Sequence, residues 1–157
     1  MSSPQAEGPY GFLRTCIDKR FVEATRRAFE ERVRRDLNLT PEQFGPTSYW
    51  HEAYAGGSAK APPGFPDGTS DGETYAAKHG AIVFGWQAHI SNCGGFPEPP
   101  PPQDPVIIAG LRATFEQKQK DHPTAIFQYM ILARETEPGK VDIHFTPYPP
   151  DAEEPSI

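Results

Sequence analysis

The sequence contains few of the features that mark secreted or membrane-bound proteins. Only two cysteines occur in 157 residues, too few for the disulfide framework that holds many small secreted domains together. The longest apolar stretches, such as residues 81–86, are far shorter than the ~18 residues of a membrane-spanning helix. The N-terminal segment has neither a basic start nor an apolar run, so no signal peptide is expected. These absences predict a cytoplasmic protein without a membrane span.

The chain also lacks an excess of positive charge. Its 15 basic and 21 acidic residues give a net charge of −6, which argues against binding to nucleic acid or to an anionic membrane. Eight of the 15 basic residues lie between positions 14 and 35, interspersed with four acidic ones. This mixture is typical of a solvated, salt-bridged helix face. We therefore expect neither nucleic acid nor a membrane as a partner of the chain.

The length favours a single domain with one core. Apolar residues make up 36% of the chain, and 19 prolines and 14 glycines predict many loops. Residues 1–10 resemble a flexible arm, and the acidic, proline-rich residues 147–157 resemble a disordered tail. The domain is therefore expected to span residues 11–146.

Hydrophobic periodicity predicts alternating strands and helices. We expect strands at residues 12–17, 47–54, 81–89, 125–133 and 141–145, and helices at 21–37, from Thr40 onward, at 74–79 and at 104–120. The near-continuous apolar start of the 81–89 segment indicates a strand buried on both faces. This order predicts an α/β fold with a mainly parallel central sheet, flanking helices and a C-terminal hairpin edge.

Local patterns specify three of these helices further. The first is expected to bury the face formed by Val22, Phe29, Val33 and Leu37. Thr40, Pro41 and Gln43 have capping-box spacing, which predicts the start of a short helix. Asp104 before Pro105 is expected to cap the helix over residues 104–120.

Both cysteines and one histidine follow predicted strands. Cys16 lies near the end of the first strand, and His89 and Cys93 lie where the strand at 81–89 ends. The carboxyl ends of neighbouring parallel strands meet at one edge of a sheet, where ligands commonly bind. Two thiolates and one imidazole form a three-ligand zinc set that leaves a fourth position open, as in catalytic sites. The alternative is that each cysteine is a small buried hydrophobe.

Asp18 and Arg20 follow Cys16 closely. A carboxylate beside the metal can accept the remaining proton of a bound hydroxide and orient its lone pair toward an electrophile. A bidentate arginine can hold that carboxylate ionised. If the pair breaks, the freed Asp18 can instead become the fourth metal ligand. The alternative roles are a helix cap for Asp18 and a surface cation for Arg20.

Cys-x-Asp-x-Arg at residues 16–20, followed much later by a strand that leads into His89 and Cys93-Gly-Gly, resembles the β-class carbonic anhydrases. The resemblance implies zinc on Cys16, His89 and Cys93, with Asp18 and Arg20 as the catalytic dyad. It implies reversible hydration of CO2 to bicarbonate by a metal-bound hydroxide, in a lyase that forms a homodimer. Related members of that family hydrolyse COS or CS2, and the sequence does not discriminate between these substrates.

Two departures from the family pattern bear on the site. The family has His-x-x-Cys, whereas residues 89–93 carry one extra residue. A bulge or widened turn can absorb it; otherwise the imidazole is displaced from the metal. The segment at residues 53–57 lacks the arginine that the family has there. A non-catalytic binding protein on the same scaffold is therefore an alternative, and His51 is a candidate proton shuttle or an ordinary loop histidine.

Overall fold

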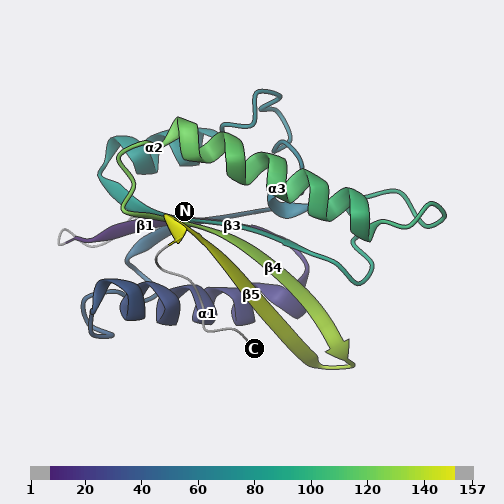
Figure 1. Ribbon diagram of the computed structural model, residues 1–157, viewed down its shortest axis with the longest axis horizontal. Helices are drawn as coiled ribbons and strands as arrows, with labels where there is room; N and C mark the ends of the chain where they lie inside the picture. Colours follow the sequence, from purple (N-terminus) through teal and green to yellow (C-terminus); the bar gives the residue numbers. More distant parts are fainter. Residues whose placement is uncertain (1–7, 151–157) are drawn as a thin grey trace.

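A computed structural model describes residues 8–150 of the chain. It contains a five-stranded sheet, three α-helices and a short 3₁₀ helix (Figure 1). The strands are β1 (Tyr10–Cys16), β2 (Tyr49–Tyr54), β3 (Ala81–His89), β4 (Phe127–Glu137) and β5 (Lys140–Tyr148). The helices are α1 (Lys19–Leu37), η1 (Gly57–Ala59), α2 (Asp71–Lys78) and α3 (Asp104–Asp121). No helix in residues 8–150 is long and apolar enough to cross a membrane.

The sheet has the strand order β2-β1-β3-β4-β5. The first four strands in this order are parallel, and β5 pairs with β4 in the antiparallel direction. The predicted α/β class, mainly parallel sheet and C-terminal hairpin edge are confirmed. Because β1 and β3 are neighbours, their carboxyl ends meet at one edge, and this brings Cys16 close to His89.

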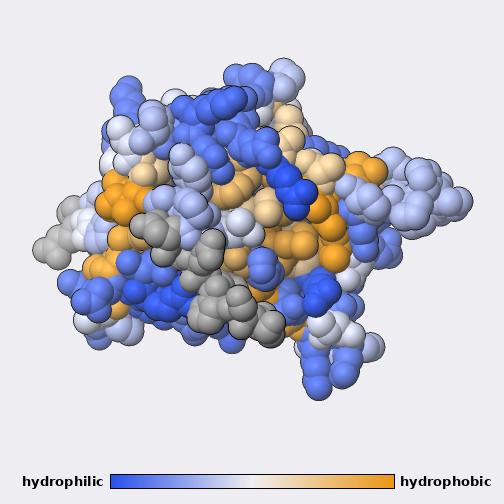
Figure 2. Space-filling view, in the orientation of Figure 1, coloured by the Kyte–Doolittle hydropathy of each residue, from blue (hydrophilic) through white to orange (hydrophobic). Residues whose placement is uncertain are grey.

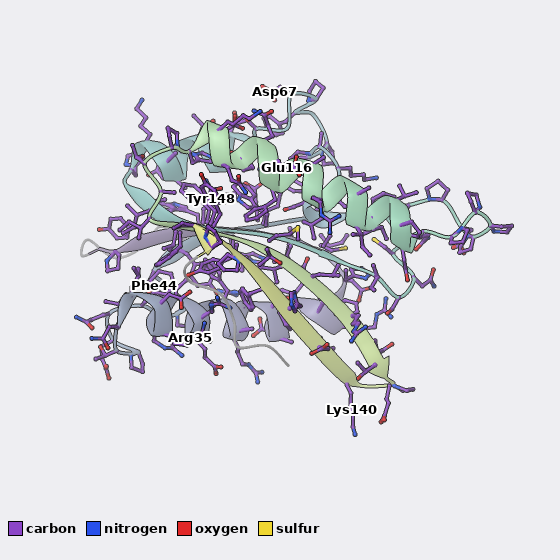
Figure 3. All side chains as sticks on the ribbon, in the orientation of Figure 1. Arg35, Phe44, Asp67, Glu116, Lys140 and Tyr148 are labelled. Carbon is purple, nitrogen blue, oxygen red and sulfur yellow. The ribbon has the colours of Figure 1, made fainter. Side chains whose placement is uncertain are left out.

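Helices cover both faces of the sheet (Figure 1). α1 lies on one face, and α2 and α3 lie on the other. In Figure 3, Arg35 lies on the α1 side of the molecule, and Asp67 and Glu116 lie on the opposite side. All but one of the nine residues of β3 are buried, which confirms the prediction that this strand is covered on both faces.

The buried face of α1 differs from the prediction at both ends. Asp18 caps the helix, and the buried stripe begins at Phe21 and continues through Thr25 and Phe29 to Val33. Val22 and Leu37, which were also expected in this stripe, are only half-buried. Residues four apart lie one above another on a helix, and Phe21 is in register with Phe29 and Val33.

The short helix predicted from Thr40 does not form. Thr40 and Gln43 make both hydrogen bonds of the capping box, at 2.9 and 3.3 Å. The segment nevertheless ends as a turn. Gly45 and Pro46 follow at once, and a proline cannot donate the backbone hydrogen bond that a helix needs. The prediction was therefore correct about the local cap and wrong about the element.

Several predicted boundaries are also corrected. Tyr10 belongs to β1 rather than to an N-terminal arm, and β5 continues through Pro147 to Tyr148, into the segment expected to be a disordered tail. Residues 1–7 and 151–157 lie outside the described part of the chain. Asp104 is the first helical residue of α3, after Gln103 at the cap position.

Apolar side chains reach the surface between α3 and the β4–β5 hairpin (Figure 2). A shallow groove there is lined by Leu111, Met130, Leu132 and Thr146, among others. Lys140 lies at the turn of the same hairpin and points away from the molecule (Figure 3). The elements thus leave apolar side chains exposed between α3 and the hairpin on this face of the molecule.

Candidate metal centre

Cys16, His89 and Cys93 converge at the carboxyl edge of the sheet. Their sulfur and imidazole nitrogen atoms all lie within 4.8 Å of one another. Cys16 is the last residue of β1 and His89 the last residue of β3, while Cys93 comes from the loop after β3. All three are buried, with 3%, 1% and 1% of their surfaces exposed. The predicted juxtaposition is confirmed, and the group could hold a metal ion.

The separation of the two sulfur atoms fits metal coordination. Cys16 Sγ and Cys93 Sγ lie 3.9 Å apart, much farther than the ~2.05 Å of a disulfide bond. Two sulfur atoms bound at ~2.3 Å to a tetrahedral zinc ion lie about 3.8 Å apart. The two thiols therefore already have the spacing that a tetrahedral ion requires.

His89 presents one free ring nitrogen to this group. Its Nδ1 lies 2.9 Å from the carbonyl oxygen of Ile90, which fixes Nδ1 as the protonated nitrogen. Its Nε2 is buried and has no hydrogen-bond partner among the described residues. A buried polar atom without a partner is costly, and a metal ion would satisfy it. In a metal-binding histidine, the ring nitrogen that does not bind the metal usually donates a hydrogen bond, often to a backbone carbonyl. Nδ1 of His89 has this arrangement.

The surroundings favour the thiolate form of Cys16. Burial raises the pKa of this thiol, but the His89 ring in its protonated form and two backbone N–H groups outweigh burial and lower the pKa to about 7. Those N–H groups belong to Asp18 and Gly56. Burial, together with the nearby Cys16, raises the pKa of Cys93. Metal binding requires deprotonated thiols, and Cys16 is prepared for it before any ion is bound.

Asp18 and Arg20 form the predicted pair beside the triad. Arg20 Nη2 lies 2.7 Å from Asp18 Oδ2, and Arg20 Nε lies 3.1 Å from Asp18 Oδ1. These hydrogen bonds lower the pKa of Asp18, which keeps the carboxylate ionised. Asp18 also accepts a hydrogen bond from the Arg20 backbone N–H as the cap of α1. The helix-cap role and the predicted pair therefore coexist.

The carboxylate of Asp18 reaches the edge of the triad. Asp18 Oδ2 lies 3.6 Å from His89 Nε2, and the Asp18 side chain is 24% exposed. It thus lies between the buried ligand atoms and solvent. This position suits a hydrogen-bond acceptor for a molecule that enters beside the triad.

The extra residue between His89 and Cys93 is absorbed in a turn. Ser91 and Asn92 both have left-handed backbone conformations, with φ of 73° and 68°. Two consecutive left-handed residues bend the chain sharply, and serine and asparagine tolerate this region better than bulky residues. Of the two outcomes considered above, the structure therefore has the widened turn, and the imidazole stays at the triad.

Two buried glutamines hold the cysteines in place, and neither was predicted. Gln87 Oε1 accepts a hydrogen bond from the backbone N–H of Cys16 at 2.8 Å, and its amide donates to Thr25 on α1. Gln103 accepts from the N–H of Cys93 at 2.8 Å and donates to the Cys93 carbonyl at 3.1 Å. The only sequence signal was the presence of polar residues within apolar surroundings, which is too general to assign a role.

Glycines allow the loops around the cysteines to approach closely. A Cβ atom on Gly95 would lie 2.5 Å from the backbone nitrogen of Gly56. A Cβ atom on Gly57 would lie 2.3 Å from the carbonyl oxygen of Gln87, and Gly57 has a φ of +57°. Both contacts exclude any larger residue. The close approach places the Gly56 N–H beside both thiols.

His51 does not lie at the triad. Its Nε2 is 2.8 Å from the hydroxyl oxygen of Thr15, and no hydrogen bond or ion pair found in the described residues joins it to Asp18 or His89. The candidate role as proton shuttle has no support in this geometry. Burial lowers the pKa of His51 to about 4, so this side chain is neutral near pH 7.

Comparisons of the chain with protein-family models, with curated proteins and with solved structures found no match. The function of the site must therefore be inferred from its own geometry. That geometry consists of two thiols, one unpartnered imidazole nitrogen and an adjacent ionised carboxylate.

Proposed function

We propose that the protein is a zinc lyase of the β-carbonic anhydrase type, which interconverts CO2 and bicarbonate. The observation that carries the proposal is the position of the Asp18–Arg20 pair beside the buried Cys16, His89 and Cys93. A structural zinc site has four protein ligands, whereas this group offers three and an adjacent carboxylate paired with arginine. The proposal includes a β-carbonic-anhydrase-like fold. The strand order and the position of the site at the carboxyl edge of the sheet support this part of the proposal.

Each residue has a distinct role in the proposed reaction. Cys16, His89 and Cys93 would hold the zinc ion, which supplies a Lewis acid that lowers the pKa of bound water. Asp18 accepts a hydrogen bond from the attacking hydroxide and orients its lone pair toward the carbon atom of CO2. Arg20 keeps Asp18 ionised and fixed. One C–O bond forms, bicarbonate leaves, and the released proton passes to buffer.

Stopped-flow measurement of CO2 hydration tests this proposal. In zinc-loaded protein, the variant Asp18→Asn should lose about 100-fold or more in kcat/KM, because misorientation of a reacting group costs about that much. Asp142→Asn is the matched control: Asp142 pairs with Arg134 on the hairpin surface, and its loss should leave the rate unchanged. Equal rates in wild type and Asp18→Asn would remove Asp18 from the mechanism.

The same preparation separates the alternatives. If the protein hydrolyses COS or CS2 but does not hydrate CO2, the sulfur compounds are the substrates of the same site. Specific binding of a protein by the metal-free chain, with no turnover of any of the three substrates, would favour a non-catalytic scaffold. The homodimer implied by the resemblance belongs to the same proposal, and sedimentation equilibrium tests it.

A further inference from the structure

The Arg20 guanidinium is held from two sides. One side pairs with Asp18, as described above. On the other side Arg20 Nη2 donates to the carbonyl oxygens of Ser91 and Asn92 at 3.2 and 3.1 Å. Arg20 Nη1 lies 3.3 Å from Glu135 Oε1. We call the two carbonyls and the Glu135 carboxylate the Arg20 clamp.

The carbonyls of the clamp come from the turn that absorbs the extra residue. Ser91 and Asn92 are the two left-handed residues between His89 and Cys93. Both residues present their carbonyl oxygens to the same guanidinium nitrogen. The turn therefore supplies two acceptors to Arg20 in addition to keeping the imidazole at the triad.

The third member of the clamp comes from a different element. Glu135 lies near the end of β4, where the pairing with β5 shifts register. Its backbone N–H lies 3.4 Å from Ser91 Oγ, which ties the strand to the turn. Its second carboxylate oxygen accepts from the N–H of Gly139 at 3.2 Å. Glu135 is thus fixed between the hairpin and the loop before Cys93.

The clamp changes what the Asp18–Arg20 pair can do. The two side chains are 24% and 35% exposed, and a partly exposed pair between residues two apart is held only weakly by itself. Arg20 also lies over the Phe21 ring, 4.8 Å from its centre, and Phe21 stacks on His89. An arginine fixed from several directions cannot follow Asp18 if that carboxylate turns toward the metal ligands.

We propose that Glu135 and the carbonyls of Ser91 and Asn92 position Arg20 so that Asp18 stays in its pair and does not become a fourth metal ligand. Glu135 is a positioning residue in this account, since it touches Arg20 and not the reacting groups. The positioning itself does not require a metal. Its consequence for catalysis rests on the proposed function.

Side-chain NMR of the full chain tests the clamp without metal or activity. The Arg20 Nε–Hε signal, assigned by its loss in Arg20→Lys, should have an order parameter near the ~0.85 of rigid groups. In Glu135→Ala it should fall below about 0.6, and Glu135→Gln, which keeps an acceptor oxygen, should restore part of the loss. Glu137→Ala is the control, because Glu137 pairs only with Lys140 among the described ion pairs at the hairpin surface. An unchanged Arg20 order parameter in Glu135→Ala would overturn the proposal.

The backbone amide of Gly139 distinguishes positioning from simple loosening of the hairpin. If Glu135 serves only the hairpin, Glu135→Ala will mobilise the Gly139 amide and leave the Arg20 side chain rigid, which contradicts the clamp. In cobalt-substituted protein, Glu135→Ala should also shift the visible absorption toward that of a carboxylate-bound ion. This shift should vanish when Asp18→Asn is added, because no carboxylate then remains to bind.

The proposed function and the clamp fail in different ways. A chain that binds no metal and hydrates no CO2, but whose Arg20 becomes mobile in Glu135→Ala, keeps the clamp and loses the proposed function. If the zinc-loaded protein is active and Arg20 is equally rigid in the wild type and in Glu135→Ala, the proposed function stands and the clamp is wrong. In active protein, loss of the clamp should lower kcat about two- to fivefold, as expected for one partly exposed charge pair.

Discussion

At the residue scale, the imidazole of His51 makes the stability of the fold depend on pH. Its pKa is lowered from 6.5 to about 4 because the ring is largely buried. Below pH 6.5 the unfolded chain takes up a proton that the folded chain does not accept until about pH 4. The unfolded state then binds more protons, so the free energy of unfolding falls as pH decreases through this window.

We expect the wild type to lose about 2 kcal/mol through His51 between pH 7 and pH 4, after allowance for the part of the ring that is exposed. The variant His51→Gln should lack this loss, which urea unfolding at a series of pH values measures. His144→Gln, at an exposed position of β5, should keep the wild-type slope. Parallel pH profiles for wild type and His51→Gln would show that His51 titrates normally.

Gln103 contributes to the metal centre from outside the triad. Besides its two hydrogen bonds to Cys93, it donates to the carbonyl oxygen of Pro97 at 3.0 Å. Gln103→Leu would leave a buried N–H and buried carbonyl groups without partners. We expect a loss of about 2 kcal/mol in the free energy of unfolding and a 10- to 100-fold weaker affinity for zinc.

Urea unfolding and competition with a zinc chelator measure the two effects of Gln103→Leu. Gln117→Leu on the exposed side of α3 is the control, since Gln117 bonds only to Asp121 among the described residues. Unchanged zinc affinity in Gln103→Leu would mean that the loop before α3 holds Cys93 without this amide.

The ligand residues could be predicted because the sequence shows both their metal-binding side chains and the ends of the strands on which they lie. Cys16 and His89 end two strands, and adjacency of these strands suffices to bring them together. The positions of Gln103 and Glu135 could not be predicted in this way. Their roles depend on how a long proline-rich loop and a hairpin return to the site, and no periodicity encodes that path.

At the element scale, a buried cluster of charges joins α2 and α3 to the sheet. Glu73 on α2 is fully buried and accepts hydrogen bonds from Arg14 of β1 and Lys118 of α3, each at 2.7 Å. His122, just after α3, lies 2.6 Å from the same carboxylate. Burial raises the pKa of Glu73, but these partners outweigh burial and keep its pKa below the ordinary value.

Removing the charge of Glu73 should therefore destabilise the fold strongly. Glu73→Gln leaves Arg14 and Lys118 buried without their shared counter-ion, a change that costs about 3–5 kcal/mol. Glu116→Gln on the exposed face of α3 should cost almost nothing. Urea unfolding of both variants measures the difference, and similar midpoints would mean that Glu52 and ordered water neutralise the two cations.

The elements themselves were largely predictable, and the exceptions share a physical cause. β3 and α3 combine strong periodicity with clear start signals, and their predicted positions agree with the structure to within a residue. The segment from Thr40 has a start signal without enough chain before Gly45 to form a helix. β5 continues through Pro147 because an edge strand tolerates a residue that cannot donate a hydrogen bond.

At the scale of the whole molecule, the three candidate ligands connect segments far apart in sequence. An ion bound by Cys16, His89 and Cys93 would join β1, β3 and the following loop. Binding only to the folded state adds about 4 kcal/mol when the free metal exceeds its dissociation constant 1,000-fold. For a chain of this size this corresponds to about 10 °C in Tm.

Calorimetry of zinc-loaded protein before and after removal of the ion by a chelator should show this fall in Tm. The Cys93→Ser variant should melt at the lower temperature in both conditions. If the chelator leaves the wild-type Tm unchanged, the stability of the fold does not depend on a bound metal ion.

Elemental analysis of the protein, purified under reducing conditions without added metal, tests the central claim most directly. We predict about one zinc ion per chain in the wild type and almost none in Cys93→Ser. Absence of zinc from the wild type, even after the metal is offered, would contradict the account. Cys16 and Cys93 would then be buried core residues, and the proposed lyase would be wrong.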